Sequence, residues 1–263
     1  MHFARATSPV VSGTILHLDG ETWDEPGGGG GMTARALPGL GADRARFYTA
    51  LGDDETARAC RRQLESDGLD VRAGVRRGPQ NQVLGVIDPH GERTLFVLGG
   101  NEHPTLADPL PWDELAEFDS AFFTGEDPRT LVAARRAGVL VVTARRLASL
   151  IESGMRADVL IGSASDPGEQ FDLSDLPVKP RAVVRTEGAA GGSYRTDAGV
   201  EGRYRPAPLP GPVADTYGAG DVMMAALTLE LGAGRALEEA LARAAIAAAG
   251  QLTRRGATPP AAA

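Results

Sequence analysis

The sequence predicts an α/β protein with a mainly parallel central sheet, helices on its faces and a small extra sheet beside it. Two observations carry this prediction. Short apolar runs alternate with helix-like stretches, as strands buried on both faces of a parallel sheet do. A hairpin-like segment interrupts the series and cannot belong to a parallel sheet. The apolar runs are residues 120–124, 139–143, 159–161 and 182–184.

The N-terminal part begins with a β-prone run at residues 10–18, which predicts a strand that ends in a turn at Asp19-Gly20. Pro26 is followed by five glycines at 27–31. This run is either a slack linker or a loop that brings bare backbone amides close to a ligand. Residues 46–51 predict a strand, 52–54 its turn, and 55–66 a helix that starts near Asp54.

The middle of the chain predicts a β-hairpin, because turn residues at 88–91 separate two β-prone runs at 82–87 and 92–98. A helix is expected at 128–137. Two Ala-rich runs at 220–231 and 236–252 predict helices that cover one face of the sheet. The last residues, 259–263, are expected to be a frayed tail.

Composition excludes several classes of function. A net charge of −8 repels a nucleic-acid backbone, so we expect no nucleic-acid partner. Lys179 is the one lysine and lies outside any glycine-rich phosphate loop, which excludes a Walker A nucleotide site. Cys60 is the one cysteine, no Cys/His group has zinc-ligand spacing, and no apolar run could span a bilayer. With no signal-peptide core at its start, the chain is expected to be cytoplasmic and to bind no membrane.

The segment at 216–221 is the strongest chemical signal. It places Gly218, Ala219 and Gly220 directly before a helical run, so backbone amides point to one spot at a helix N-terminus and favour an anion there. Asp221 then begins the helix, beside the same spot, where it can accept a hydroxyl proton. The alternative is that the glycines only turn the chain and Asp221 caps an ordinary helix.

The run Asp-Thr-Tyr-Gly-Ala-Gly-Asp at 215–221 resembles the D-T-x-G-A-G-D signature of the ribokinase-like (pfkB) carbohydrate kinase family. The resemblance covers about residues 11–257, because weaker blocks follow in the family's order. These blocks are Gly52-Asp53-Asp54, the hairpin residues Gly91-Glu92-Arg93-Thr94, Gly99-Gly100-Asn101, Thr186-Glu187-Gly188-Ala189-Ala190-Gly191 and Arg254-Arg255-Gly256-Ala257.

The resemblance implies one ribokinase-like domain over 1–263, a three-layer α/β/α sandwich with a small β lid at about 12–25 and 81–100. It implies an ATP-dependent kinase, with Mg²⁺ accompanying ATP, that phosphorylates a hydroxymethyl group of a sugar, sugar acid or nucleoside. A homodimer is also implied, because lids of this family often pair between subunits.

Roles for individual residues follow from the same resemblance. Asp221 is the expected general base, and the amides of Gly218, Ala219 and Gly220 form the anion hole. The expected nucleotide contacts are Thr186, Gly188, Gly191 and Thr216. The expected acceptor contacts are Asp19, Gly28, Gly29, Gly30 and Asn101. No protein metal ligand is expected.

The chain departs from the family pattern mainly on the acceptor side. Met32 stands where the family has Asn, and Pro38 interrupts the helix expected to follow the glycines. Asp19 is one residue further from its strand glycine than usual, and Thr143 stands where the family often has Asp.

Two further questions stay open. Arg145 and Arg146 face either an anionic substrate or solvent, and solvent is the favoured interpretation. The N-x-x-E motif lacks its Asn, so either Asp166 or Glu169 replaces its function or the metal network is weakened.

Two other functions remain alternatives. A catalytically weakened ribokinase-like protein would bind a ligand or protein partner without turnover, as the missing Asn residues suggest. A dinucleotide-dependent oxidoreductase is poorly supported, because no strand is followed by G-x-G-x-x-G.

Overall fold

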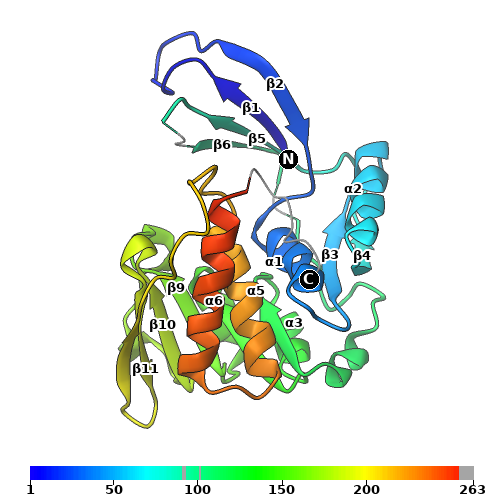
Figure 1. Cartoon of the computed structure of the whole chain (residues 1–263). Helices are drawn as coiled ribbons and strands as arrows, with labels where there is room; N and C mark the ends of the chain where they lie inside the picture. The colour runs from blue at the N-terminus through cyan, green and yellow to red at the C-terminus, as the bar shows by residue number, and fades with distance from the viewer. Residues whose placement is uncertain (91–92, 101, 255–263) are drawn as a thin grey trace.

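A six-stranded sheet forms the centre of the computed structural model, which describes residues 1–90, 93–100 and 102–254 (Figure 1). Its order is β12-β11-β10-β9-β8-β7. Neighbours from β7 to β10 pair in parallel, whereas β11 and β12 are antiparallel. The predicted apolar strands are therefore confirmed. The strands are β7 Ser120–Phe123, β8 Val139–Thr143, β9 Val159–Ser163, β10 Ala182–Thr186, β11 Gly192–Thr196 and β12 Glu201–Tyr204.

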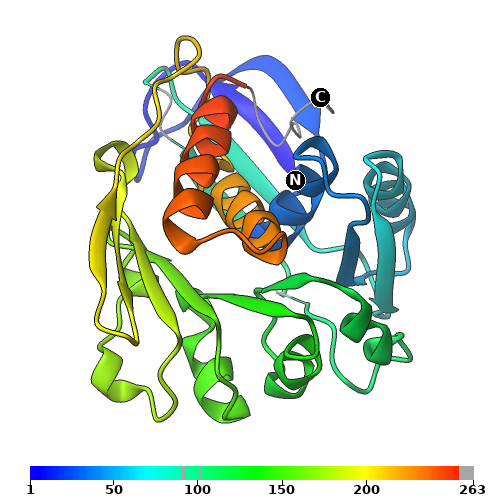
Figure 2. The same ribbon diagram turned by 60° about the horizontal axis from the view of Figure 1, so that its bottom comes forward.

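Helices cover both faces of this sheet, as Figure 2 shows. On one face lie α5 (Ala219–Gly232) and α6 (Leu237–Leu252), which pack Leu227 and Leu241 against Val141. On the other lie α3 (Pro128–Ala134) and α4 (Leu147–Ser153), which pack against Leu140 and its neighbours. Successive residues of β8 thus enter opposite cores, because strand side chains alternate between faces. The C-terminal helices are confirmed within two residues at each end.

A separate two-stranded parallel sheet contains β3 (Arg46–Leu51) and β4 (Asp70–Val75), joined by α2 (Glu55–Ser66). The predicted strand, turn and helix are confirmed, and the Asp54 carboxylate caps the helix by accepting the Ala57 N–H at 2.8 Å. β4 was not predicted, since Arg72 and two small residues interrupt its apolar pattern. No backbone ladder joins this pair to the six-stranded sheet, so the parallel strands form two sheets.

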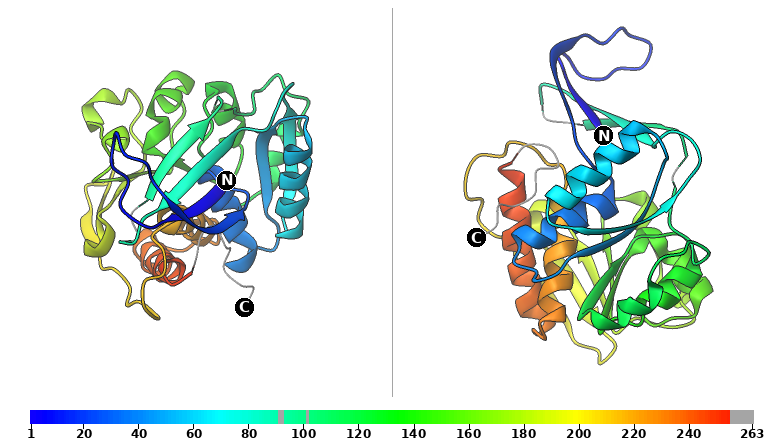
Figure 3. Two further views of the ribbon diagram at one scale, coloured as in Figure 1. Left: turned by 90° about the horizontal axis from the view of Figure 1, so that it is seen from above. Right: turned by 90° about the vertical axis from the view of Figure 1, so that its right-hand side faces the viewer.

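A four-stranded sheet lies at one end of the molecule, beyond the helices (Figures 1 and 3). Its order is β2-β1-β5-β6, and the β5–β6 pair is the predicted hairpin. The strand predicted at 10–18 is wrong: β2 begins at Leu18, and residues 10–17 lie outside strands, with Ile15 85% exposed. These residues have β propensity but no partner strand or core face to pack on. The strands are β1 His2–Ala6, β2 Leu18–Asp24, β5 Gln82–Ile87 and β6 Arg93–Leu98.

The glycine run is the start of helix α1 (Gly29–Gly39), which excludes the slack-linker interpretation. Gly28 precedes the helix at φ 81°, a left-handed conformation that favours glycine. Pro38 lies in the last turn, so the helix is short, as expected. Ala36 packs against Val222 and Ala225, which places α1 directly beside α5. Within the described ranges, no helix combines the length and apolarity needed to cross a membrane.

Candidate active site

The N-terminus of α5 carries the predicted chemical segment. Gly218 is the residue before the helix and adopts φ 76°. A methyl group there would lie 2.3 Å from Met32 Cε, so only glycine fits on both counts. The first intrahelical bond runs from Val222 N to Gly218 O at 2.8 Å. The amides of Ala219, Gly220 and Asp221 therefore precede the hydrogen-bonded part of the helix and are available to an anion.

The N-terminus of α1 meets the same place. A methyl group on Gly29 would lie 3.2 Å from Asp221 Oδ1, so the glycine backbone approaches the carboxylate without a side chain between them. The Thr33 hydroxyl donates a hydrogen bond to Asp221 O at 3.3 Å and ties the two helices together. Two helix N-termini thus converge on Asp221, and both favour negative charge there.

The loop before α5 is fastened to the four-stranded sheet. Asp215 Oδ1 accepts the Tyr217 N–H at 2.9 Å and the Arg93 Nη1–H at 3.3 Å. The Arg93 guanidinium also lies over the Tyr217 ring, 4.3 Å from its centroid, and this ring meets Phe3 edge-on at 5.3 Å. Arg93 of β6 therefore joins the four-stranded sheet to the segment that carries Asp221.

The loop that follows β9 contributes the Glu169 carboxylate. Glu169 Oε2 accepts the Ser163 N–H at 2.6 Å, and Oε1 lies 3.4 Å from Arg145 Nε. Arg145, which follows β8, also forms an ion pair with Asp166. Arg145 is about half-exposed, so its side chain faces solvent as favoured, and its guanidinium also lies between two carboxylates.

The surroundings of Asp221 hold its pKa unusually high. Burial and then the nearby Glu169 carboxylate raise the pKa of Asp221 to about 7, while Arg93 and Arg145 act in the opposite direction. Burial and the Asp221 charge likewise raise the pKa of Tyr217 to about 12. A base with a pKa near neutrality can accept a proton and stay partly ionised at the pH of the cell.

The residues predicted to contact the nucleotide lie in two separate loops. Thr186 is the last residue of β10, at the same edge of the parallel sheet as Ser163, and its carbonyl accepts the Ala164 N–H at 2.9 Å. Gly188 and Gly191 form the tight turn to β11, where a methyl on Gly191 would lie 2.3 Å from Tyr204 O. Thr216 is exposed beside Tyr217.

The structure brings only some of the residues predicted to contact the acceptor close to Asp221. Gly28, Gly29 and Gly30 lie at the start of α1, and the Gly29 backbone adjoins Asp221. Asp19 is exposed on β2. Asn101 lies outside the described residues, as do Gly91, Glu92 and residues 255–257.

Met32, at the family's Asn position, is 2% exposed and packs in a core with Phe3, Ile87 and Tyr217. The apolar side chain therefore serves packing here.

The donor set for Mg²⁺ is small. The described residues contain no group of three or more His, Cys, Asp or Glu side chains that could hold a metal ion. Asp166 and Glu169 are the carboxylates at the end of β9, and both are paired with Arg145. This arrangement fits an ion that is held mainly by nucleotide phosphates and waters, with these carboxylates nearby.

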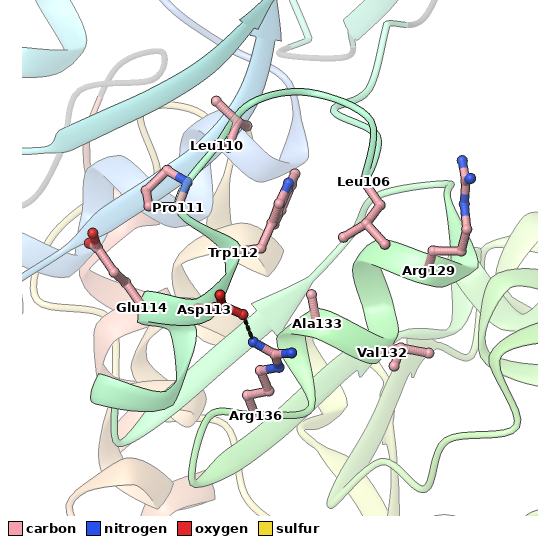
Figure 4. Close-up of a pocket in the computed structure, with 10 residues that line it drawn as sticks. All are labelled: Leu106, Leu110, Pro111, Trp112, Asp113, Glu114, Arg129, Val132, Ala133 and Arg136. Atoms are coloured by element: carbon pink, nitrogen blue, oxygen red, sulfur yellow. Dashed lines mark hydrogen bonds and ion pairs between the residues drawn. The ribbon is translucent and has the colours of Figure 1, made fainter.

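Two surface hollows lie away from Asp221. One, of about 540 Å³, lies between the segment 106–114 and α3, with Trp112 on one wall and Val132 on the other (Figure 4). The other, of about 670 Å³, lies over β10, β11 and β12 and includes Phe171 and Arg185. Neither is lined by Asp221 or the α1 glycines. The chemical argument for the site rests on the geometry around Asp221.

Comparisons with known proteins agree with this architecture. The sequence pattern of the pfkB family carbohydrate kinases matches residues 4–155 and 173–263. An ATP-dependent ribose-1-phosphate kinase of Halopiger xanaduensis is 30% identical over 216 residues, which cover 76% of this chain and 71% of that protein.

Solved structures are similar in fold at lower identity. A ribokinase from Thermotoga maritima has a TM-score of 0.75 at 21% identity, covering 97% of this chain and 90% of its own. An adenosine kinase from Sinorhizobium meliloti has a TM-score of 0.75 at 18% identity, covering 99% of this chain and 93% of its own. These structures show a ribokinase-like fold.

Proposed function

This chain belongs to the pfkB family of carbohydrate kinases and is a ribokinase-like enzyme, and we propose that it transfers a phosphoryl group from ATP to a hydroxymethyl group of a sugar, sugar acid or nucleoside. One observation carries the proposal. The Asp221 carboxylate lies where the N-termini of α1 and α5 converge, with a pKa of about 7.

Asp221 acts as the general base in the proposed reaction. Its carboxylate accepts the proton of the acceptor hydroxyl as the oxygen attacks the γ-phosphorus of ATP in line with the leaving ADP. Burial and Glu169 raise the proton affinity of the carboxylate, while Arg93 and Arg145 keep part of it ionised at neutral pH.

The amides of Gly218, Ala219 and Gly220 are proposed to bind the oxygens of the transferring phosphoryl group. The first turn of α5 leaves such amides without acceptors within the helix, and the helix dipole adds to their effect. Donors that are already oriented need no rearrangement as negative charge develops, which is why such holes contribute strongly to catalysis.

ATP is proposed to lie along Thr186, Gly188, Gly191 and Thr216. Mg²⁺ bound to its phosphates would supply countercharge near Asp166 and Glu169. The protein's own contribution there is to hold two carboxylates at the end of β9, with Arg145 fixing their direction.

The acceptor is proposed to enter between the α1 glycines and the four-stranded sheet, with Gly28, Gly29, Gly30, Asn101 and Asp19 as candidate contacts. Residues 12–25 and 81–100 would then form the lid of a single domain spanning 1–263. The relative from Halopiger xanaduensis is described as acting on ribose 1-phosphate, so phosphorylated pentoses belong among the candidate acceptors.

We also propose a homodimer formed through β6. This strand is at the edge of the four-stranded sheet, and the side chains of Leu95, Phe96, Val97 and Leu98 are all exposed. A strand that is apolar on both faces and open at its edge is suited to pairing with a second copy.

An acceptor screen tests the proposed reaction. Purified protein is incubated with MgATP and single candidates (ribose, ribose 1-phosphate, fructose, sugar acids, adenosine), and ADP and the phosphorylated product are measured by coupled assay and mass spectrometry. We expect one class to give stoichiometric ADP and product. Ligand binding without product across the panel would instead support the weakened, non-catalytic alternative.

A further inference from the structure

Arg185 is the charged residue of strand β10, where it follows three apolar residues. Its neighbour Val184 is buried against the α5 and α6 face, so the Arg185 side chain lies on the other face of the sheet. There its Nη1 donates to Glu169 O at 2.8 Å and its Nη2 donates to Phe171 O at 2.9 Å. The guanidinium also lies over the Phe171 ring, 3.7 Å from the centroid.

The segment held by Arg185 has little regular structure of its own. After β9 it contains one short 3₁₀ turn, Pro167–Glu169. The Gln170 amide donates to Ser163 O at 2.9 Å and to Ala164 O at 3.0 Å, which closes the loop on itself. Arg185 is different, because it ties this loop to the adjacent strand and bonds the backbone of Glu169 itself.

Holding these carbonyls has an electrostatic cost. Burial lowers the pKa of Arg185, and in the described part of the chain no carboxylate lies within ion-pair distance of its guanidinium. Its two bonds to carbonyls and its contact with Phe171 replace water instead. One guanidinium donates to the carbonyls on both sides of Gln170, those of Glu169 and Phe171, and this bidentate contact is more specific than packing alone would require.

The loop that Arg185 holds, residues 163–171, acts on the proposed catalytic centre through Glu169. The carboxylate of this residue receives the Ser163 N–H and Arg145, and it is the charge that most opposes ionisation of Asp221. Arg185 is also followed directly by Thr186, the proposed nucleotide contact at the end of β10. One side chain therefore links the nucleotide strand to the acidic loop.

We propose that Arg185 is a positioning residue for phosphoryl transfer, which orders the loop that bears the Glu169 carboxylate by holding the Glu169 and Phe171 carbonyls from the strand that leads into Thr186. The catalytic part of this inference rests on the proposed function. The structural part, that Arg185 orders residues 163–171, can be measured without any substrate.

The kinetic test is a double-mutant cycle between Arg185→Met and Glu169→Gln, with Arg185→Lys as the conservative variant. Arg195→Met is the matched control, because Arg195 lies on the same sheet face of the neighbouring strand and forms a surface ion pair with Glu201. With the acceptor found in the screen, we expect R185M to lower kcat by roughly 10- to 100-fold, since small misplacements in a site have effects of that size.

The outcome of the cycle identifies the route of the effect. If Arg185 acts through Glu169, the double variant has nearly the kcat of E169Q alone, R185K recovers part of the loss, and R195M stays within about twofold of wild type. Losses that multiply in the double variant, or a change in KM for ATP with kcat unchanged, would overturn the proposal.

Hydrogen–deuterium exchange supplies the measurement that needs no turnover. We expect amides of residues 163–171 to exchange faster in R185M than in wild type or R195M, with the rest of the described chain unchanged. Unchanged exchange in this segment overturns the positioning role even if the enzyme is active. Faster exchange in a protein that phosphorylates no acceptor would leave the loop contact standing and reject the proposed function.

Discussion

Asp221 lies where opposing electrostatic effects meet. Two helix N-termini and two arginines favour its charge, whereas burial and Glu169 oppose it, and the result is a pKa of about 7. The signature around Asp221 is the sequence feature from which its role as the base is proposed. The contacts of Arg93, Arg145 and Glu169 were not predictable, because these residues lie on or just after strands that are distant in the chain and meet only when the sheets form.

Asp221→Asn is expected to stabilise the protein at alkaline pH. The carboxyl pKa rises from 3.8 to about 7 on folding, so the unfolded chain loses this proton first as pH increases. The stabilising contribution of this group is complete below about pH 4 and decreases as the pH rises to about 7. Above that pH the free energy of unfolding is lower by at most roughly 4 kcal/mol. Thermal melts should show a larger gain in Tm for the variant at pH 8 than at pH 5. An equal gain at both pH values would contradict the high pKa.

Gly29→Ala is expected to impair catalysis without unfolding the protein. The added methyl would lie 3.2 Å from Asp221 Oδ1 and crowd the carboxylate, whereas a methyl on Gly31 meets nothing within 4 Å. We expect kcat/KM to fall roughly tenfold or more for G29A, by displacement of the base. Gly31→Ala is the matched control and should keep wild-type kinetics, with equal or higher Tm because alanine favours a helix. Equal kinetics for both variants would argue against the close approach.

At the level of elements, sequence patterns predicted those with strong local signals. The parallel strands β7 to β10, helix α2 with its Asp54 cap and the Ala-rich helices all have such signals. The strand predicted at 10–18 failed, because β propensity alone does not provide a partner strand. The glycine run was ambiguous for the opposite reason: glycine is a poor helix former, and the packing of α1 against α5 stabilises the helix.

Arg93 connects two elements, the four-stranded sheet and the loop before α5, and its charge lowers the pKa of Asp221. Arg93→Met should therefore move the acidic limb of the kcat/KM profile to higher pH, because the remaining groups then oppose ionisation more strongly. Profiles measured from pH 5.5 to 9 test this sign. Arg5→Met, on β1 of the same four-stranded sheet, is the control and should leave the pH of the acidic limb unchanged. A limb that moves to lower pH in R93M would contradict the electrostatic role of Arg93.

At the scale of the whole molecule, the four-stranded sheet carries an exposed apolar strand, β6. Val97 of β6 is 63% exposed, and its neighbours on the strand are also open to solvent. The sequence predicted the hairpin, but only the topology shows that β6 is the edge strand.

The proposed homodimer makes this edge testable. Val97→Glu should convert a dimer to a monomer in analytical ultracentrifugation, because a buried carboxylate would oppose strand pairing. Val75→Glu is the control, since Val75 is similarly exposed, at 65%, at the end of β4. A wild-type protein that is monomeric at all concentrations would reject the dimer.

The most direct test of the account is single-turnover transfer by Asp221→Asn. Wild-type protein and the variant are mixed with excess acceptor and limiting MgATP, and product is followed in a quench-flow instrument, with ATP affinity measured in parallel. The account predicts that D221N binds ATP about as well as wild type but forms product at least roughly 10²-fold more slowly, the range expected for loss of a general base. Transfer by D221N within a few-fold of the wild-type rate would contradict the assignment of Asp221 as the base.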